Sequence, residues 1–186
     1  KSKEEQAQVF DRQLEQLGCG YFDYYLLHSQ GAYNLKKSEE LDSFSFIREK
    51  KAQGLVRHIG MSWHDSAQLL DQTLTLHPEL EVVQLQLNYL DWDNESIQSR
   101  KCYEVARKHG KPVIVMEPVK GGTLTKLPDE ARQLFQSYNP DASMASWALR
   151  FAASHEGVMM VLSGMNSLEQ MKDNIGFMKD FQSMNE

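Results

Sequence analysis

Residues 21–28 read Tyr-Phe-Asp-Tyr-Tyr-Leu-Leu-His, and this stretch decides the fold. Apolar and aromatic side chains fill nearly every position, which is typical of a strand covered on both faces. Alternation along a strand assigns His28 and Leu26 to one face and Leu27 and Tyr25 to the other. The sequence therefore predicts a buried strand of an α/β protein, with a histidine at its carboxyl end as a candidate functional residue.

Strands and helices are expected to alternate along the rest of the chain. The alternation predicts a parallel sheet with right-handed crossovers, without linkers or low-complexity segments. A long stretch at 117–141 contains a short helix near 129–137, and loops of this length are usually functional. Further strands are expected at 55–62, 81–89, 111–116 and 158–162. Helices are expected at 3–17, 39–53, 96–109 and 142–155, between Asp65 or Ser66 and Pro78, and after Ser167.

Two of the helices have clear end signals. Ser38 is expected to cap the helix at 39–53, and Ser167 with Gln170 forms a capping box for the last helix. Spacing of three and four residues predicts a buried apolar stripe on the last helix. The residues of this stripe are Leu168, Met171, Ile175 and Met178.

The strand at 81–89 distinguishes two architectures, an open doubly wound sheet and a (β/α)8 barrel. Its polar face carries Gln84, Gln86 and Asn88. A barrel interior near the active-site end tolerates such a row better than a sheet face covered by helices. No glycine-rich GxGxxG turn follows any of the expected strands, which argues against a Rossmann fold. We therefore predict a (β/α)8 barrel arrangement, with residues 1–186 forming a single domain.

Composition excludes several classes of function. The 186 residues carry a formal net charge of -6, which argues against a nucleic-acid partner. No apolar run approaches the ~20 residues of a membrane span, so no membrane partner is expected. Cys19 and Cys102 are far apart in the sequence and lack metal-ligand spacing, so we expect reduced thiols, no metal site and a cytoplasmic protein.

The chain resembles the aldo-keto reductases over essentially its whole length, from the helix before the fourth barrel strand to the helix after the eighth. Two stretches, MEPVKGG and LQLNYLDWDN, are most similar to the branch that often carries an iron–sulfur module after the barrel, but this chain contains no such cysteines. The resemblance implies an NAD(P)H-dependent oxidoreductase that reduces aldehydes or ketones to alcohols. The matching stretches are YFDYYLLH, AQGLVRHIGMS, VVQLQLNY, ARKHGKPVIVMEPVKGG, ASWALRF and VLSGMNSLEQMKDN.

The resemblance also implies roles for individual residues. His28 matches the active-site histidine that hydrogen-bonds the substrate carbonyl. Ser62 and Gln86 match residues that bind the nicotinamide carboxamide, although the asparagine usual after that serine is Trp63 here. Met116 matches the tyrosine that stacks on the nicotinamide ring in many members, and a methionine can form a soft apolar floor there.

The adenosine end of the coenzyme, NADPH or NADH, is implied by the same resemblance. Asp173 and Asn174 match the pair that contacts adenine, and Ser163 and Gly164 are expected at the same edge of the barrel. NADP-preferring members carry lysine and arginine where this chain has Gly164 and Gln170. We therefore expect NADH to bind at least as well as NADPH, unless Lys120 or Lys172 supplies the missing cation.

The chain accounts for five of the eight βα units of a barrel, which needs ~250 residues. In the family, the other three units carry the aspartate, the tyrosine and the lysine of the catalytic group. A non-catalytic nucleotide-binding or interaction module is therefore the alternative function. We expect a missing N-terminal segment to complete the barrel. Without it, the chain is expected to self-associate or stay partly disordered because Tyr24, Leu26 and Val115 would be exposed.

Overall fold

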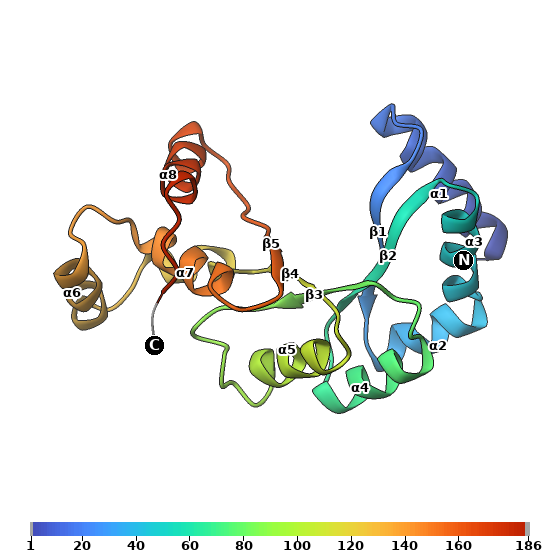
Figure 1. The fold of residues 1–186 in the computed structure, drawn as a ribbon, viewed down its shortest axis with the longest axis horizontal. Coiled ribbons are helices and arrows are strands. Elements are labelled where there is room, and N and C mark those ends of the chain that lie inside the picture. The colour runs from blue at the N-terminus through green and yellow to red at the C-terminus, as the bar shows by residue number, and fades with distance from the viewer. Residues whose placement is uncertain (1, 185–186) are drawn as a thin grey trace. The chain divides into compact units, whose positions relative to one another are not determined.

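The computed structural model describes residues 2–184 and has the predicted alternation of strands and helices (Figure 1). Five strands follow one another in chain order in one sheet, and the strand pairs whose register is defined are parallel. The strands are β1 (Phe22–Gln30), β2 (Val56–Trp63), β3 (Val82–Gln86), β4 (Val113–Met116) and β5 (Val158–Val161). The helices are α1 (Lys3–Leu17), α2 (Ala32–Glu40), α3 (Ser43–Ala52), α4 (Ala67–Leu76), α5 (Ser99–Lys108), η1 (Lys120–Thr125), α6 (Asp129–Tyr138), α7 (Met144–Ala153) and α8 (Leu168–Lys179).

The chain divides into two compact units. The first contains residues 1–84 and 105–111, and the second contains residues 85–104 and 112–186. Helix α5 therefore begins in the second unit and ends in the first. The predicted α/β fold class, the strands of a partial barrel, is confirmed.

The first unit has its core between β1, β2 and the helices that flank them. Phe10 of α1 and Ile47 of α3 are fully buried, and Phe10 meets the ring of Tyr25 edge to face at 5.0 Å between centroids. Gly60 of β2 lies so close to β3 that an added Cβ would be 2.3 Å from the Val82 carbonyl oxygen. Only glycine fits there, because close approach of the strand backbones leaves no room for a side chain.

Strand β1 is less covered than the sequence predicts. Leu27 is buried, but Tyr24 is 37% exposed and Leu26 is half-buried. The strand lies at the end of the strand order and therefore has a sheet neighbour on one side only, β2. The predicted exposure is thus found for Tyr24 and only in part for Leu26, and it is wrong for Val115, which is fully buried in β4 beside β5.

The predicted helix at 39–53 corresponds to α3, which begins only at Ser43, and the preceding helix α2 was not predicted. Asp42 has a left-handed φ of 57° and separates α2 from α3. Ser38 lies inside α2, where it is buried and donates a hydrogen bond to Gln30 Oε1 at 3.0 Å, so its predicted capping role is wrong. Local sequence rules assign the Ser38 hydroxyl to a helix cap, but in the structure it bonds to the side chain of Gln30 instead.

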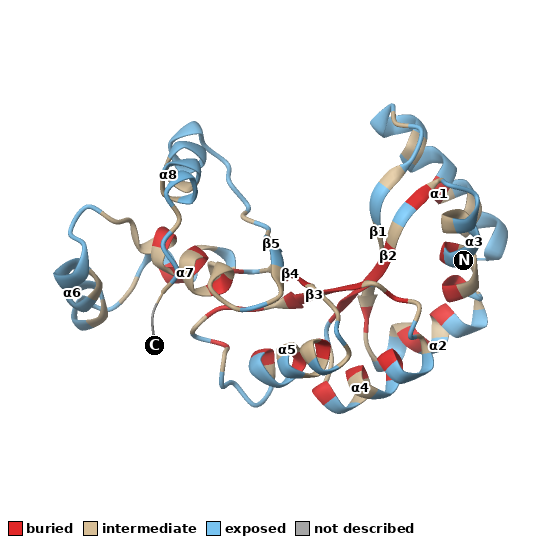
Figure 2. Cartoon of the chain, in the orientation of Figure 1, coloured by how far each residue is buried: buried red, intermediate tan, exposed pale blue. Residues whose placement is uncertain are grey.

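The second unit contains α6, α7 and α8, and α8 contradicts one prediction. Ser167 caps this helix as expected, with its hydroxyl accepting from the Gln170 N–H at 3.2 Å. The predicted stripe of Leu168, Met171, Ile175 and Met178 is exposed, however, and α8 has no buried residue (Figure 2). Periodicity marked an apolar face correctly, but no element among residues 2–184 covers it.

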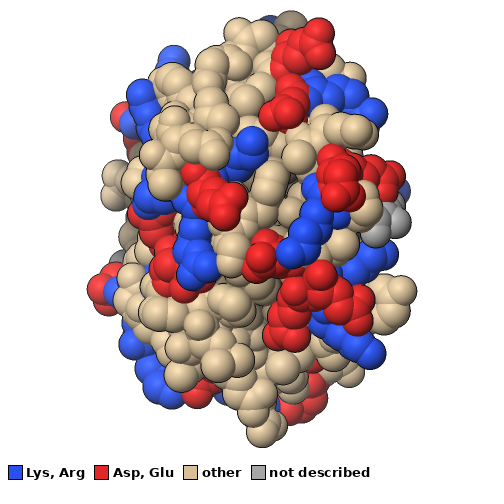
Figure 3. All heavy atoms as spheres, turned by 90° about the vertical axis from the view of Figure 1, so that its right-hand side faces the viewer, with Lys and Arg blue, Asp and Glu red and all other residues tan. Residues whose placement is uncertain are grey.

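Charges of both signs are interspersed on the surface shown in Figure 3, where no large region of a single sign is seen. Pairs such as Arg57 with Asp23, whose atoms are 2.7 Å apart, neutralise one another locally. None of the helices formed by residues 2–184 has the length and apolar character that crossing a membrane requires.

Candidate functional site

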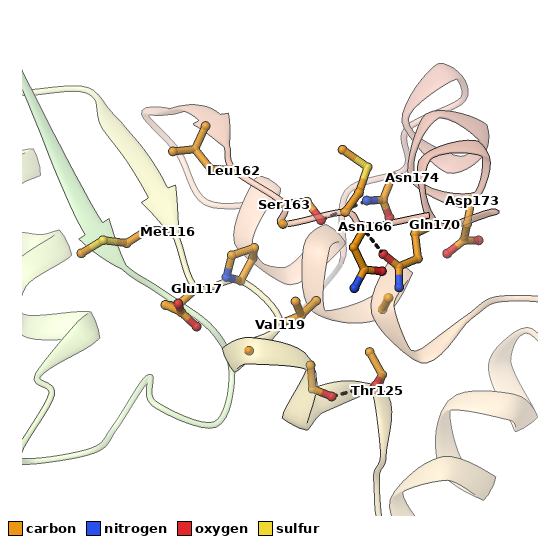
Figure 4. Close-up of a pocket in the computed structure, with 16 residues that line it drawn as sticks. Met116, Glu117, Val119, Thr125, Leu162, Ser163, Asn166, Gln170, Asp173 and Asn174 are labelled. Atoms are coloured by element: carbon orange, nitrogen blue, oxygen red, sulfur yellow. Dashed lines mark hydrogen bonds between the residues drawn. The ribbon is translucent and has the colours of Figure 1, made fainter. Parts of the chain in front are cut away.

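The second unit contains a pocket of about 510 Å³ where β4 and β5 end and α8 passes (Figure 4). Met116 lines it from the end of β4, and Ser163 and Gly164 line it from the segment after β5. Asp173 and Asn174 line it from α8. Five residues that were predicted as coenzyme ligands therefore lie around one cavity.

The polar side chains of this pocket are held by hydrogen bonds. Asn174 donates from Nδ2 to Ser163 Oγ at 3.0 Å, which joins α8 to the segment after β5. Ser143, the N-cap of α7, donates its hydroxyl to Asp173 Oδ2 at 2.5 Å. Gln170 Oε1 accepts from the Asn166 backbone N–H at 2.8 Å (Figure 4). These bonds fix the direction of the pocket's polar groups before any ligand arrives.

A strained loop lines the opposite part of the pocket. Glu117 and Lys120 have φ values of 55° and 49°, which non-glycine residues rarely adopt. Gly121 and Gly122 follow with φ values of 59° and 90°, and a Cβ on either would meet no atom within 4 Å. The backbone here is open to the pocket, so a ligand can approach it closely.

The pocket lining contains two charged side chains, both acidic: Glu117 and Asp173. No lysine or arginine of residues 2–184 lines it. Lys120 is adjacent in sequence to the lining, but its Nζ bonds to Asp91 Oδ1 at 2.5 Å. The chemistry of the pocket is therefore that of hydroxyl, amide and backbone groups beside an apolar floor, suited to a polar planar ligand.

Gln86 lies in the second unit, at the end of β3, and does not line this pocket. Its Nε2 donates to Asp91 Oδ2 at 2.8 Å, and Asn88 Nδ2 donates to the same oxygen at 2.9 Å. Asp91 is 1% exposed. Burial acts to raise the pKa of this carboxyl, but hydrogen bonds from Lys120, Asn88 and Gln86 outweigh burial and lower it below the usual value.

His28 and Ser62 belong to the first unit. His28 is exposed at the carboxyl end of β1 and lines a cavity of about 550 Å³ together with Tyr24 and Tyr25. Burial lowers the pKa of the nearby His64, and the charge of His28 lowers it further. Ser62 is buried, and its hydroxyl accepts from the Ser29 N–H at 2.7 Å, which ties β2 to the irregular part of β1 directly after His28.

Trp63, which replaces the asparagine usual in the family, is turned into the protein. It is 3% exposed, and its Nε1 donates to the Asp65 carbonyl oxygen at 2.8 Å. Its ring nitrogen is therefore already used inside the first unit. Across residues 2–184, the His, Cys, Asp and Glu side chains form no group of three or more that could hold a metal ion.

Sequence reasoning missed Asp91 as part of a site. Its partner Lys120 is 29 positions away, and the two meet only because of the conformation of the strained loop. One signal was present: Asp91 follows the polar row of Gln86 and Asn88 within a few residues. A carboxylate just beyond a row of amide donors indicates a shared acceptor for them.

A sequence model of the Aldo/keto reductase family matches residues 1–185, so the chain belongs to this family. The uncharacterized oxidoreductase YqkF of Bacillus subtilis is 22% identical over 185 residues, and the match covers 88% of this chain and 57% of that protein. The chain thus spans little more than half the length of this curated relative.

Solved structures show the same fold. The aldo-keto reductase AKR11C1 from Bacillus halodurans, in its holo form, matches with a TM-score of 0.76 at 23% identity, covering 99% of this chain and 64% of that one. An aldo/keto reductase from Klebsiella pneumoniae, in complex with NADP and acetate, matches with a TM-score of 0.69 at 18% identity, covering 97% of this chain and 60% of that one.

Proposed function

We propose that the protein to which this chain belongs is an NAD(P)H-dependent oxidoreductase that reduces aldehydes or ketones to alcohols. The observation that carries the proposal is the pocket of the second unit. It is lined by Met116, Ser163, Gly164, Asp173 and Asn174, five of the residues that are expected from the sequence at the coenzyme site. The relatives from Bacillus halodurans and Klebsiella pneumoniae, solved in a holo form and with NADP, support the same ligand class.

The donor set of the pocket fits a nicotinamide nucleotide. When bound, the coenzyme supplies the hydride that adds to the carbonyl carbon. Asp173 and Asn174 would accept from and donate to the adenine, and Met116 would offer a polarizable apolar surface to the nicotinamide ring. The open backbone at Gly121 and Gly122 would let the pyrophosphate approach the loop N–H groups.

The pocket lining supports a coenzyme without a 2′-phosphate. That phosphate would bring about two negative charges to a lining whose charged side chains are Glu117 and Asp173. Of the two lysines that could compensate, Lys120 is paired with Asp91, and Lys172 does not line the pocket. We therefore propose that NADH binds at least as well as NADPH.

His28 would act on the substrate, by donating a hydrogen bond to the carbonyl oxygen and orienting the carbonyl for hydride addition. The family's tyrosine, lysine and aspartate have no match in this chain. The proton donor would therefore come from another part of the longer protein. We propose that its substrate is a small carbonyl compound.

The test compares two glycines of the second unit that both have open space around them. Gly164 lines the pocket and Gly176 does not, and neither has a positive φ. Gly164→Leu should weaken binding of NADH and NADPH more than tenfold, because the side chain fills the pocket. Gly176→Leu should bind both nucleotides like the wild type. Titration by tryptophan fluorescence measures the affinities, and the wild-type values give the NADH to NADPH ratio.

Equal affinities in the two variants would mean that the nucleotide does not bind in this pocket. A strong wild-type preference for NADPH would contradict the coenzyme proposal. If the wild type bound neither nucleotide, the oxidoreductase proposal itself would fail.

A nicotinamide-nucleotide-binding or interaction module without turnover is the second candidate. Its support is the pocket of the second unit, which would hold a nucleotide whether or not turnover occurs. Loss of NADH absorbance with a panel of aldehydes and ketones separates the two, since only the enzyme consumes coenzyme. We propose a location in the cytoplasm because Cys19 and Cys102 are far apart in the sequence and lack metal-ligand spacing.

A further inference from the structure

The second unit contains a buried carboxylate that has no assigned role in binding or catalysis. Asp91 lies in the segment after β3, 1% exposed, and accepts three side-chain hydrogen bonds. Its Oδ1 accepts from Lys120 Nζ at 2.5 Å, while its Oδ2 accepts from Gln86 Nε2 at 2.8 Å and Asn88 Nδ2 at 2.9 Å. A buried charge is costly unless it is paired, and here each carboxylate oxygen has at least one donor.

Asn88 joins this cluster to the loop that lines the pocket. Its Nδ2 also donates to the Glu117 carbonyl oxygen at 3.1 Å, and its Oδ1 accepts from the N–H of Asp91 at 2.9 Å. Lys120 forms a second link, from the same loop directly to the Asp91 carboxylate. Two strained loop positions, Glu117 and Lys120, are thus each tied to the segment after β3.

The carboxylate also determines which end of the Gln86 amide faces it. An ionised carboxylate only accepts hydrogen bonds, so the NH₂ group of Gln86 must point to Asp91 and the carbonyl oxygen must lie at the other end. A Gln86 amide turned by 180° would set its Oε1 against Asp91 Oδ2 and lose the bond. The charge at position 91 therefore leaves Oε1 as the end that can accept a hydrogen bond from a ligand.

We propose that Asp91 is a positioning residue for the nicotinamide end of the coenzyme. It holds Gln86 so that Oε1 accepts from the carboxamide N–H of the nicotinamide, and it holds the 117–122 loop through Lys120. This inference rests on the proposed function and on the role that the family resemblance implies for Gln86, which is to bind the nicotinamide carboxamide. Asp91 itself acts through Gln86 and does not touch the coenzyme.

The test varies only the acceptor at position 91. Removing the charge of Asp91 alone would leave Lys120 unpaired, so both variants also carry Lys120→Met. D91N/K120M keeps an oxygen that can accept from Gln86, whereas D91L/K120M has similar volume and no acceptor. In the full-length protein, fluorescence titration measures affinity for NADH and for ADP-ribose, which lacks the nicotinamide.

D91N/K120M should bind NADH at least tenfold more tightly than D91L/K120M, because about one hydrogen bond to the coenzyme depends on the acceptor. The two variants should bind ADP-ribose within threefold of each other. Adding Gln86→Leu should abolish the NADH difference, because the effect passes through that residue. Thermal melts of all variants identify those that are folded at the assay temperature.

Three results from the variants would overturn the inference. NADH affinities that agree between the two variants would show that the acceptor is irrelevant. An equal drop for ADP-ribose would show a general structural role instead of a nicotinamide-specific one, and so would a NADH difference that persists with Gln86→Leu. A wild type that binds neither NADH nor ADP-ribose overturns the proposed function as well, whereas normal wild-type binding with no variant difference overturns only the role of Asp91.

Discussion

At the scale of single residues, two tyrosines of the second unit differ in how their hydroxyl groups are satisfied. The Tyr89 hydroxyl is buried and has no hydrogen-bond partner among residues 2–184. The Tyr103 hydroxyl donates to the Glu156 carbonyl oxygen at 2.7 Å. A buried hydroxyl without a partner costs stability, whereas a paired one contributes to it.

Tyr89→Phe should therefore leave stability unchanged or raise it by ~1 kcal/mol, and Tyr103→Phe should lower it by a similar amount. Chemical denaturation of both variants measures the free energy of unfolding. A loss in Tyr89→Phe as large as that in Tyr103→Phe would show that the Tyr89 hydroxyl does have a partner.

Tyr89 also predicts how the stability of the protein changes at alkaline pH. Burial raises the pKa of Tyr89 to about 12 from 10.0. Its neutral form is favoured by folding, so this contribution is fully present below pH 10 and is lost as the pH rises from 10 towards 12. The free energy of unfolding of Tyr89→Phe should therefore change less than that of the wild type between pH 10 and 12. Absorbance at 295 nm should show that the variant has one tyrosine fewer among those that ionise at high pH.

His28 gives a prediction on catalysis. In the full-length enzyme, His28→Ala should lower turnover ~10²–10³-fold and leave NADH affinity unchanged, because one positioned donor to the carbonyl is lost. His58→Ala is the control: His58 is also a histidine of the first unit, but its ring stacks on Tyr24 at 4.9 Å. Single-turnover reduction and thermal melts on the same preparations measure activity and stability. A His28→Ala variant that lost stability but kept its activity per folded molecule would contradict the catalytic role.

At the scale of elements, two serine N-caps differ in whether their hydroxyl also bonds to a second helix. Ser143 caps α7 by accepting from the Ser146 N–H at 3.0 Å, and its hydroxyl also donates to Asp173 of α8. Ser66 caps α4 in the first unit, accepting from the Leu69 N–H at 3.4 Å. Both caps stabilise their helices, but only that of α7 reaches a residue of the pocket.

Ser143→Ala and Ser66→Ala should each cost ~1 kcal/mol of stability, the usual loss for a serine cap. Ser143→Ala should in addition weaken NADH binding several-fold, because Asp173 loses a hydrogen bond that orients it, while Ser66→Ala should leave binding intact. Denaturation and fluorescence titration separate the two effects. Equal binding by both variants would show that the Ser143 bond has no influence on the pocket.

At the scale of the whole molecule, each unit has large apolar side chains in contact with solvent. Tyr21 and Tyr24 of the first unit are 39% and 37% exposed, and Met160 and Ile175 of the second are 42% and 49% exposed. Apolar patches of this kind normally mark surfaces that another segment or molecule covers. The solved relatives are longer, since the match covers 64% of the Bacillus halodurans protein.

We expect the 186-residue chain by itself to be inactive as a reductase and to self-associate or remain partly disordered. We propose that adding an N-terminal segment with further strands gives a monomer with activity, because the added strands would pair with the edge of β1. Light scattering and thermal melts measure this. A stable, cooperatively melting monomer of 186 residues would contradict the expectation.

The sequence by itself determined the order of the strands and of most helices, because hydrophobic periodicity and end signals act within a few residues. The strand at 21–28, the cap at Ser66 and the turn at Gly18, where φ is 61°, follow from neighbours along the chain. The coenzyme role predicted for Asn174 came from the resemblance to the family, and Ser163 was singled out because it directly follows the last expected strand.

Only the tertiary structure decided which distant groups meet and which faces are covered. Asp91 bonds to Lys120 because Glu117 and Lys120 adopt left-handed conformations that local rules would not assign to them. The Ser38 hydroxyl bonds to Gln30 instead of capping a helix, and the apolar stripe of α8 is exposed. Hydrogen bonding and burial of these groups depend on partners far away in sequence, and a periodic pattern contains no information about whether such a partner is there.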